Sequence, residues 1–309
     1  MRYFLLSYNR PHLQITLKSM PETVLQHIEL LVVPAEYAAY KNNGLSQKLK
    51  AVRSWPEYLD CVPKKRHWLA QNAGDDYILM DDDINMYVWS SSQSKFVPAL
   101  KEPHAFCKHF LEELPQQFDK YASVACANKF MADQYARESG LVKENSVGFV
   151  VSGFKHGTTR EVKVGRTFVY TDIDLPLQVY QNHGTSCQYY GIAYNHASNK
   201  ALEATGTNTY RNDFVKMDSA VRMAMLYPGI VTGASQNNNK GGGWTLKKRF
   251  SMVNKTLTAV SIQKSLDFVK ETCVAHSLKR PPKPYAWDFT TPRAKILNTY
   301  TRLWEEAKR

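Results

Sequence analysis

Three consecutive carboxylates follow an apolar run of strand length, and their spacing suits the binding of a metal ion. Residues 77–80 read Tyr-Ile-Leu-Met without polar alternation, and Asp81, Asp82 and Asp83 come next. Such a run indicates a parallel strand covered on both faces, and these strands carry ligands at their carboxyl ends. Three acids repel one another, whereas a hard divalent cation that accepts carboxylate oxygens stabilises them. For the triplet alone, an acidic turn that caps the next helix is the alternative.

Two later groups could complete such a site. Asp172 and Asp174 stand at the start of a helix predicted from residue 174, and His196 ends a strand predicted over residues 191–196. A carboxylate can accept the proton of an attacking hydroxyl, and an imidazole favours Mn²⁺ over Mg²⁺ because it is the softer ligand. The simpler interpretations are that the two acids cap the helix, where a carboxylate suits the helix dipole, and that the histidine is an ordinary strand residue.

The N-terminal part of the chain alternates between predicted strands and helices. Buried strands are expected over residues 3–7, 28–33 and 77–81, and mostly helical segments over residues 12–20 and 45–73. Strand, helix, strand, helix, strand is the order of an α/β sheet with a parallel core and right-handed crossovers.

The rest of the chain gives weaker signals. A helix is predicted over residues 104–121, a strand over 122–127, short strands and a loop over 140–170, and a terminal helix over 291–309. Residues 237–244, Asn-Asn-Asn-Lys-Gly-Gly-Gly-Trp, are too rich in glycine for the interior of an element, so a mobile loop is expected there.

Charge is distributed unevenly along the chain. The 309 residues are 43% hydrophobic, which excludes a disordered chain, and they carry a net charge of +12. Residues 206–309 hold 18 Lys and Arg against 7 Asp and Glu, a net +11, whereas the other 205 residues hold 22 against 21. A local basic excess is typical of a surface that binds a polyanion, with nucleic acid first and an anionic membrane or acidic glycan next. A basic surface that serves solubility alone is the remaining alternative.

The cysteines and the hydropathy of the sequence indicate in which cellular compartment the protein is expected. The five cysteines are odd in number, far apart and without a Cys-x-x-Cys pair, so neither a disulfide framework nor a zinc site is indicated. The apolar stretch at the N-terminus is too short for a signal peptide, and no segment approaches the roughly 20 apolar residues of a membrane span. We therefore expect a soluble, cytoplasmic protein without a membrane partner.

In their order along residues 1–211, these groups resemble the GT-A glycosyltransferase fold. In that family an opening strand, a loop similar to Ser-Tyr-Asn-Arg at residues 7–10 and a strand similar to residues 30–33 hold the nucleotide. A basic helix similar to residues 64–70 then precedes an Asp-x-Asp motif. The resemblance implies a Rossmann-like mixed α/β sheet flanked by helices. It further implies a nucleotide-sugar-binding catalytic core over residues 1–205, followed by a basic acceptor-binding region over 206–309.

The resemblance also assigns roles to residues. Asp83 would be the principal ligand of Mn²⁺ or Mg²⁺, with Asp81 and His196 completing the set. Asp172 would be the general base, and Asp174 would either cap the helix or act as the base in place of Asp172. The sequence departs from the family here, because Thr171 stands where the family has Glu. Contacts to the UDP-sugar donor would come from Ser7, Asn9, Arg10, Glu36, Lys65, Arg66, Asp81 and Asp82.

Within the GT-A enzymes, the chain is most similar to the phage TET-associated DNA glycosyltransferases. The similarity rests on Ser-Tyr-Asn-Arg-Pro-His at residues 7–12, Asp-Asp-Asp-Ile at 81–84, Asp-x-Asp-Leu-x-Leu-Gln at 172–178 and Thr-Asn-Thr-Tyr-Arg at 207–211. Members add sugars to 5-hydroxymethylpyrimidines, such as 5-hydroxymethylcytosine, in phage DNA inside the host cytoplasm. A base extruded from the duplex would need phosphate clamps and a stacking side chain beside it. The expected DNA contacts are Arg211, Lys240, Trp244, Lys247, Lys248 and Arg249.

Two other functions stay open at this point. The chain could glycosylate a polysaccharide or capsule, or it could be a non-catalytic nucleic-acid-binding module on a GT-A scaffold. The sequence does not specify the donor sugar, whether a hexose or a pentose, because selectivity depends on the shape of the pocket. It also leaves open the anomeric outcome, the modified base and the oligomeric state.

Overall fold

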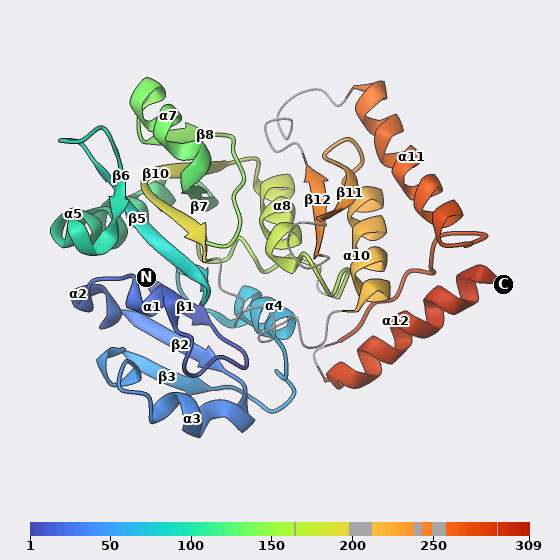
Figure 1. The fold of residues 1–309 in the computed structure, drawn as a ribbon, viewed down its shortest axis with the longest axis horizontal. Helices are drawn as coiled ribbons and strands as arrows, with labels where there is room; N and C mark the ends of the chain where they lie inside the picture. Colours follow the sequence, from blue (N-terminus) through green and yellow to red (C-terminus); the bar gives the residue numbers. More distant parts are fainter. Residues whose placement is uncertain (164, 198–211, 238–242, 249–257, 289) are drawn as a thin grey trace. The chain divides into compact units, whose positions relative to one another are not determined.

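Two compact units make up the chain (Figure 1). The computed structural model describes residues 1–163, 165–197, 212–237, 243–248, 258–288 and 290–309. The first unit comprises Met1–Val162 and Leu175–Thr209, and the second comprises Lys163–Asp174 and Tyr210–Arg309. The chain thus enters the second unit once, over Lys163–Asp174, before the main division near residue 209.

A single mixed sheet forms the centre of the first unit, with the order β3-β2-β1-β4-β9-β7-β10-β5-β6 and β8 paired to β10. The neighbours β3, β2, β1 and β4 are parallel, in the order of a Rossmann-like half-sheet. Strand β9 runs antiparallel to both β4 and β7, so β4 and β7 point the same way. Strand β10 is parallel to β7 and therefore also points the same way as β4. This arrangement confirms the predicted mixed α/β class. The strands are β1 (Arg2–Leu6), β2 (Ile28–Val32), β3 (Ala51–Ser54), β4 (Tyr77–Asp81), β5 (Ile84–Ser90), β6 (Lys95–Pro98), β7 (Ser123–Asn128), β8 (Val142–Glu144), β9 (Ser152–Phe154) and β10 (Ser186–His196).

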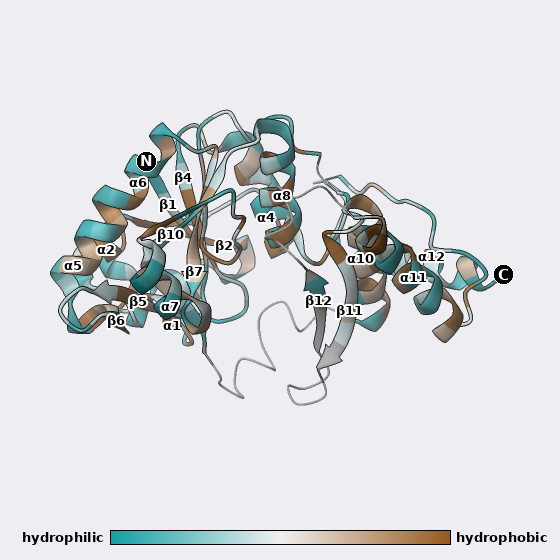
Figure 2. Ribbon diagram, turned by 90° about the horizontal axis from the view of Figure 1, so that it is seen from above, coloured by the Kyte–Doolittle hydropathy of each residue, from teal (hydrophilic) through white to brown (hydrophobic). Residues whose placement is uncertain are grey.

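Helices cover both faces of this sheet, and the period of two along each strand explains how. In β1, Tyr3 and Leu5 pack into one apolar cluster and Phe4 and Leu6 into the other. The first cluster includes side chains of α1, α2, α3 and α5, and the second includes Leu69 of α4. Figure 2 shows the hydrophobic strands between helices of mixed character. The helices are α1 (Ile15–Lys18), α2 (Glu22–Leu25), α3 (Tyr37–Lys41), α4 (Val62–Asn72), α5 (Pro103–Cys107), α6 (Leu114–Gln116), α7 (Lys129–Ser139) and α8 (Thr171–His183), with a π-helical segment, η4 (Lys108–Glu113), between α5 and α6.

The structure departs from the predicted elements at three places in the first unit. Residues 45–73 were expected to be mostly helical, but Ala51–Ser54 forms the edge strand β3, which pairs with β2 through its backbone and lacks an apolar pattern of its own. The strand β5 was not predicted, although its residues alternate between buried and half-buried positions, as expected for a strand with one face in the core. The helix predicted over residues 12–20 is only the short α1.

The second unit is mainly helical in its described part. It contains α10 (Asp213–Leu226), the hairpin β11 (Val231–Asn237) and β12 (Gly243–Lys248), α11 (Ala259–Ala275) and α12 (Arg293–Lys308). The long helix α10 packs against α11, α12 and β11. The predicted terminal helix is confirmed as α12, whereas Asn237, Gly243 and Trp244, expected in a loop, belong to the two strands; residues 238–242 lie outside the described ranges. No described helix is both long and apolar enough to cross a bilayer.

Candidate active site at the carboxyl edge of the sheet

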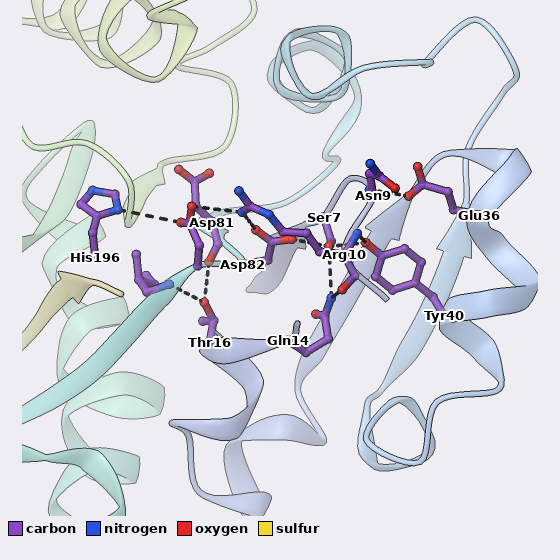
Figure 3. Close-up of polar contacts among 12 residues, drawn as sticks. Ser7, Asn9, Arg10, Gln14, Thr16, Glu36, Tyr40, Asp81, Asp82 and His196 are labelled. Carbon is purple, nitrogen blue, oxygen red and sulfur yellow. Dashed lines mark hydrogen bonds and ion pairs between the residues drawn. The ribbon is translucent and has the colours of Figure 1, made fainter. Parts of the chain in front are cut away.

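The acidic triplet meets the loop after β1 because β1 and β4 are parallel neighbours. Leu6, the last residue of β1, is in register with Asp81, the last residue of β4. The carboxyl ends of parallel strands lie at the same edge of a sheet, so Ser7 and Arg10 emerge beside Asp82 (Figure 3). Topology thus joins two sequence motifs more than 70 residues apart.

Asp82 is the most buried member of the triplet, with 4% of its surface exposed. The Ser7 hydroxyl donates to Oδ2, and the Arg10 guanidinium donates to Oδ1 at 2.7 Å. The Tyr40 hydroxyl lies 2.6 Å from Ser7 Oγ and accepts from the Arg10 backbone N–H at 2.9 Å, while Gln14 Nε2 donates to the Arg10 carbonyl at 2.6 Å. Burial raises the pKa of Asp82 to about 6, although the charge of Arg10 opposes this. These contacts anchor Asp82 inside the protein.

Asp83 lies in a different environment. Its side chain is 27% exposed, Oδ2 accepts from Arg10 at 3.0 Å, and Oδ1 lies 3.8 Å from Nδ1 of His196, whose side chain is 55% exposed. Burial alone would raise the pKa of Asp83, but the neighbouring imidazole and the guanidinium lower it to about 2. Asp83 is therefore ionised at neutral pH, and it faces a histidine from another strand.

Asp81 is paired with a cation from α4. Arg66, whose side chain is 6% exposed, donates to Asp81 Oδ1. The Asp81 backbone carbonyl accepts from Thr16 Oγ1 at 2.8 Å, and the same oxygen of Thr16 accepts from the Ile84 N–H at 3.1 Å. Thr16 therefore fixes the backbone on both sides of the triplet.

The predicted metal ligands come from two strands that end at the same edge. Asp81 and Asp83 follow β4, and His196 ends β10, which points the same way through β9 and β7. Two carboxylates and an imidazole are a donor set that suits Mn²⁺, and a carboxylate-rich set also suits Mg²⁺. As the side chains stand, no three His, Cys, Asp or Glu residues in the described ranges are grouped closely enough to hold a metal ion. Guanidinium groups hold the carboxylates instead.

Lys65, Glu36 and Asn9, which were expected to contact the donor, make contacts within the protein. Lys65 Nζ donates to the carbonyls of Ser7 at 2.6 Å and Leu31 at 3.2 Å, so it joins the ends of β1 and β2. Burial lowers the pKa of Lys65 to about 8. Glu36 Oε2 accepts from the Asn9 N–H at 2.8 Å, and Asn9 has a φ of 55°, a left-handed conformation that asparagine tolerates.

The two acids of α8 also have different environments. The helix begins at Thr171 rather than at the predicted residue 174. Asp174 is 1% exposed, and its Oδ1 accepts from the Arg166 guanidinium and from the Tyr227 hydroxyl at 2.7 Å, inside the second unit. Asp172 is only half-buried. The residue before the helix, Tyr170, has a φ of 69°, which is a strained conformation for a bulky side chain.

Three of the expected DNA contacts, Arg211, Lys240 and Arg249, lie outside the described residues. Trp244, Lys247 and Lys248 lie on β12, and the Lys247 side chain is exposed.

Sequence reasoning missed three uncharged residues of the site. Tyr40, Gln14 and Thr16 bind the loop after β1 and the backbone of the triplet. Thr16 and Gln14 fall in a segment predicted as a plain helix, and Tyr40 comes from α3. A polar residue in a short amphipathic segment gives no signal of its partner, so only the fold could show them.

Comparisons with known proteins do not identify a family for this chain. No protein-family model and no curated protein matches the sequence. One solved structure that is similar is the inositol-1-phosphate CTP transferase from T. maritima, with 9% identity and a TM-score of 0.38 over 65% of this chain and 90% of that one. Another is a putative glucose-1-phosphate thymidylyltransferase from Bacillus anthracis in complex with a sucrose, with 9% identity and a TM-score of 0.36 over 69% and 96%.

Proposed function

We propose that this chain is a metal-dependent glycosyltransferase that uses a UDP-sugar donor. The observation that supports the proposal most strongly is the meeting of Asp83 and His196, with 3.8 Å between Oδ1 and Nδ1, at the carboxyl edge of a Rossmann-like sheet. Ligands of α/β sheets bind at this edge. A divalent cation bound there stabilises the negative charge of the departing nucleoside diphosphate without a proton transfer.

Different residues of the chain would bind the cation, position Arg10 and accept the proton. Asp83 and His196, both partly exposed, would bind the cation with Asp81, and the buried Asp82 would hold Arg10 in place. Asp172 is the better candidate for the general base that accepts the proton of the acceptor hydroxyl, because it is half-buried whereas Asp174 is only 1% exposed.

For the acceptor, we propose DNA that carries 5-hydroxymethylcytosine or another hydroxymethylpyrimidine. The net charge of +11 over residues 206–309 supports a polyanionic acceptor, and Lys247 shows that part of this charge is exposed on β12. The resemblance to the phage DNA glycosyltransferases supports the hydroxymethylated base. A hydroxymethyl group supplies the nucleophilic hydroxyl that an unmodified pyrimidine lacks.

A panel of UDP-sugars with Mn²⁺, offered plain and hydroxymethylated duplexes, tests the proposal. The nucleosides released by digestion would be analysed by mass spectrometry. We expect one hydroxymethylpyrimidine to gain the mass of a sugar and the plain duplex to stay unchanged. Transfer to a polysaccharide and not to DNA would replace the acceptor but keep the reaction, whereas no turnover of any UDP-sugar would contradict the glycosyltransferase itself.

A matched pair of variants assigns the activity to this site. Asp83→Ala should abolish transfer while the affinity for the duplex stays unchanged, because the acid is remote in sequence from the basic region. Lys95→Ala removes an exposed charged side chain of the same unit and should leave transfer intact.

A further inference from the structure

In the described part of the chain, two buried guanidinium groups pair with the three acids of the triplet. Nη1 of Arg10 lies 2.7 Å from Asp82 Oδ1 and 3.0 Å from Asp83 Oδ2, so one group bridges two carboxylates. Arg66 pairs with Asp81. Each acid of the triplet thus pairs with a guanidinium group, and the partly exposed His196 lies 3.8 Å from Asp83.

Both arginines are unusually buried for their type. The side chain of Arg10 is 8% exposed and that of Arg66 is 6% exposed. A buried charge is tolerated only when a partner compensates it, so each arginine needs an anion at all times. The planar guanidinium binds phosphate oxygens in the same forked geometry as carboxylate oxygens, so a diphosphate can replace a carboxylate as that partner.

The three acids differ in how readily each can separate from its arginine partner. Asp82, with 6% of its side chain exposed and a further hydrogen bond from Ser7, is an internal anchor. Asp81 and Asp83 are 25% and 27% exposed, and each is the outer partner of one arginine. An exchange of partners at these two acids would leave the contact between Arg10 and Asp82 in place.

We infer that Arg10 and Arg66 are the groups that bind the donor's diphosphate, and that they pass from Asp83 and Asp81 to the diphosphate as a divalent cation takes over these carboxylates. The inference rests on the proposed function. A divalent cation alone would add positive charge beside two buried guanidinium groups, and a diphosphate alone would add negative charge beside three acids. Together the two additions cancel, so each should bind more tightly in the presence of the other.

The sharpest test is the sign of the effect of Arg66→Gln on cation binding without nucleotide. This change removes the guanidinium group that competes with Mn²⁺ for Asp81. The affinity for Mn²⁺ alone should therefore rise by about tenfold, within the range of coupling between linked sites. The affinity for UDP should fall by a similar factor because a phosphate partner is removed. A purely structural role for Arg66 would lower both affinities.

The binding constants of Mn²⁺ and UDP, each alone and each with the other present, would be measured by calorimetry on the full chain. Arg53→Gln is the matched control, because Arg53 pairs with Glu29 in the same unit and its loss should change neither constant. Arg66→Lys and Arg10→Lys keep the positive charge but lose the fork, so they should weaken UDP with little gain in affinity for Mn²⁺, and they protect the test against misfolding of Arg66→Gln.

The outcomes separate this inference from the proposed function. If the wild-type chain binds both ligands and Arg66→Gln binds Mn²⁺ more tightly and UDP more weakly, the exchange is supported. If the wild-type chain binds both but Arg66→Gln binds Mn²⁺ no better, the exchange is overturned and the proposed function stands. If the wild-type chain binds neither ligand, the proposed function is overturned, and the exchange with it.

Discussion

At the scale of single residues, two neighbouring acids have opposite properties. Asp82 is enclosed by Ser7 and Arg10, and burial raises its pKa, whereas the pKa of Asp83 is lowered beside His196 and Arg10. Side chains that alternate along an extended backbone reach different surroundings one residue apart. One acid therefore serves the fold, and the other faces the site where we place the chemistry.

Substitution of these two acids should separate activity from stability. Asp83→Asn should lower kcat/KM by at least about 100-fold, comparable to the loss of one transition-state-stabilising group, with little change in the free energy of unfolding. Asp82→Ala should instead cost about 3–5 kcal/mol of stability, because Arg10 loses a buried partner. Steady-state kinetics and urea unfolding of both variants check this. Equal effects of the two changes on either quantity would contradict the division of roles.

At the scale of elements, one buried acid joins three parallel strands. Glu29 on β2 accepts from Arg2 of β1 at 2.8 Å and from Arg53 of β3. Burial alone would raise the pKa of Glu29, but the hydrogen bonds and charges of the two arginines lower it to about 2. A carboxyl whose pKa is lower in the folded than in the unfolded state stabilises the fold above its unfolded pKa, and this contribution is lost as the pH falls.

The acid limb of the stability curve should therefore depend on Glu29. In the wild-type chain, the contribution of Glu29 is complete above the ordinary pKa of about 4.5 and disappears as the pH falls through about 2. Glu29→Gln should be less stable at pH 7 and should lose less stability between pH 4.5 and pH 2. Urea midpoints at several pH values would show this. Glu22→Gln, which removes an exposed partner of Lys48, is the control and should leave the curve unchanged.

The elements that could be predicted from sequence are those with a continuous apolar pattern. Strands β1, β2, β4 and β7 were expected close to their observed bounds, and their carboxyl ends therefore located Asp81 and Asp83. The edge strand β3 has no such pattern, because its pairing with β2 uses backbone groups. The partners of the triplet could not be predicted either: Arg10 reaches Asp82 across 72 residues, a contact that strand order creates and local sequence does not encode.

At the scale of the whole molecule, the charge is divided between two sequence regions. Residues 1–205, where we propose the catalytic site, carry a net +1, and residues 206–309 carry +11. Phosphate contacts release counterions, so the proposed binding of DNA should weaken steeply as the salt concentration rises. The proposed function thus places the reaction and the attraction of a polyanion in separate parts of the sequence.

Removal of basic residues around β12 should change the salt dependence of DNA binding. Replacing Lys247, Lys248 and Arg249 together by Gln should reduce the slope of log K against log salt by about 2 to 3, near 0.9 for each phosphate that the variant no longer neutralises. Fluorescence anisotropy with a labelled duplex measures the slope. Replacement of the exposed Lys95, Lys101 and Lys155 by Gln removes the same charge from the first unit and should leave the slope unchanged. If the change at Lys247, Lys248 and Arg249 reduced the slope no more than the control change does, DNA binding at this surface would be contradicted.

We propose that Asp83 and His196 bind a divalent cation at the carboxyl edge of the sheet. Pulsed electron paramagnetic resonance of Mn²⁺ with UDP and the full chain tests it directly, because a coordinated imidazole leaves a nitrogen modulation in the signal. We predict one tightly bound ion per chain, a nitrogen modulation that disappears in His196→Gln, and loss of tight binding in Asp83→Asn. Tight Mn²⁺ binding that neither variant alters, or no tight binding in the wild-type chain, would contradict the claim.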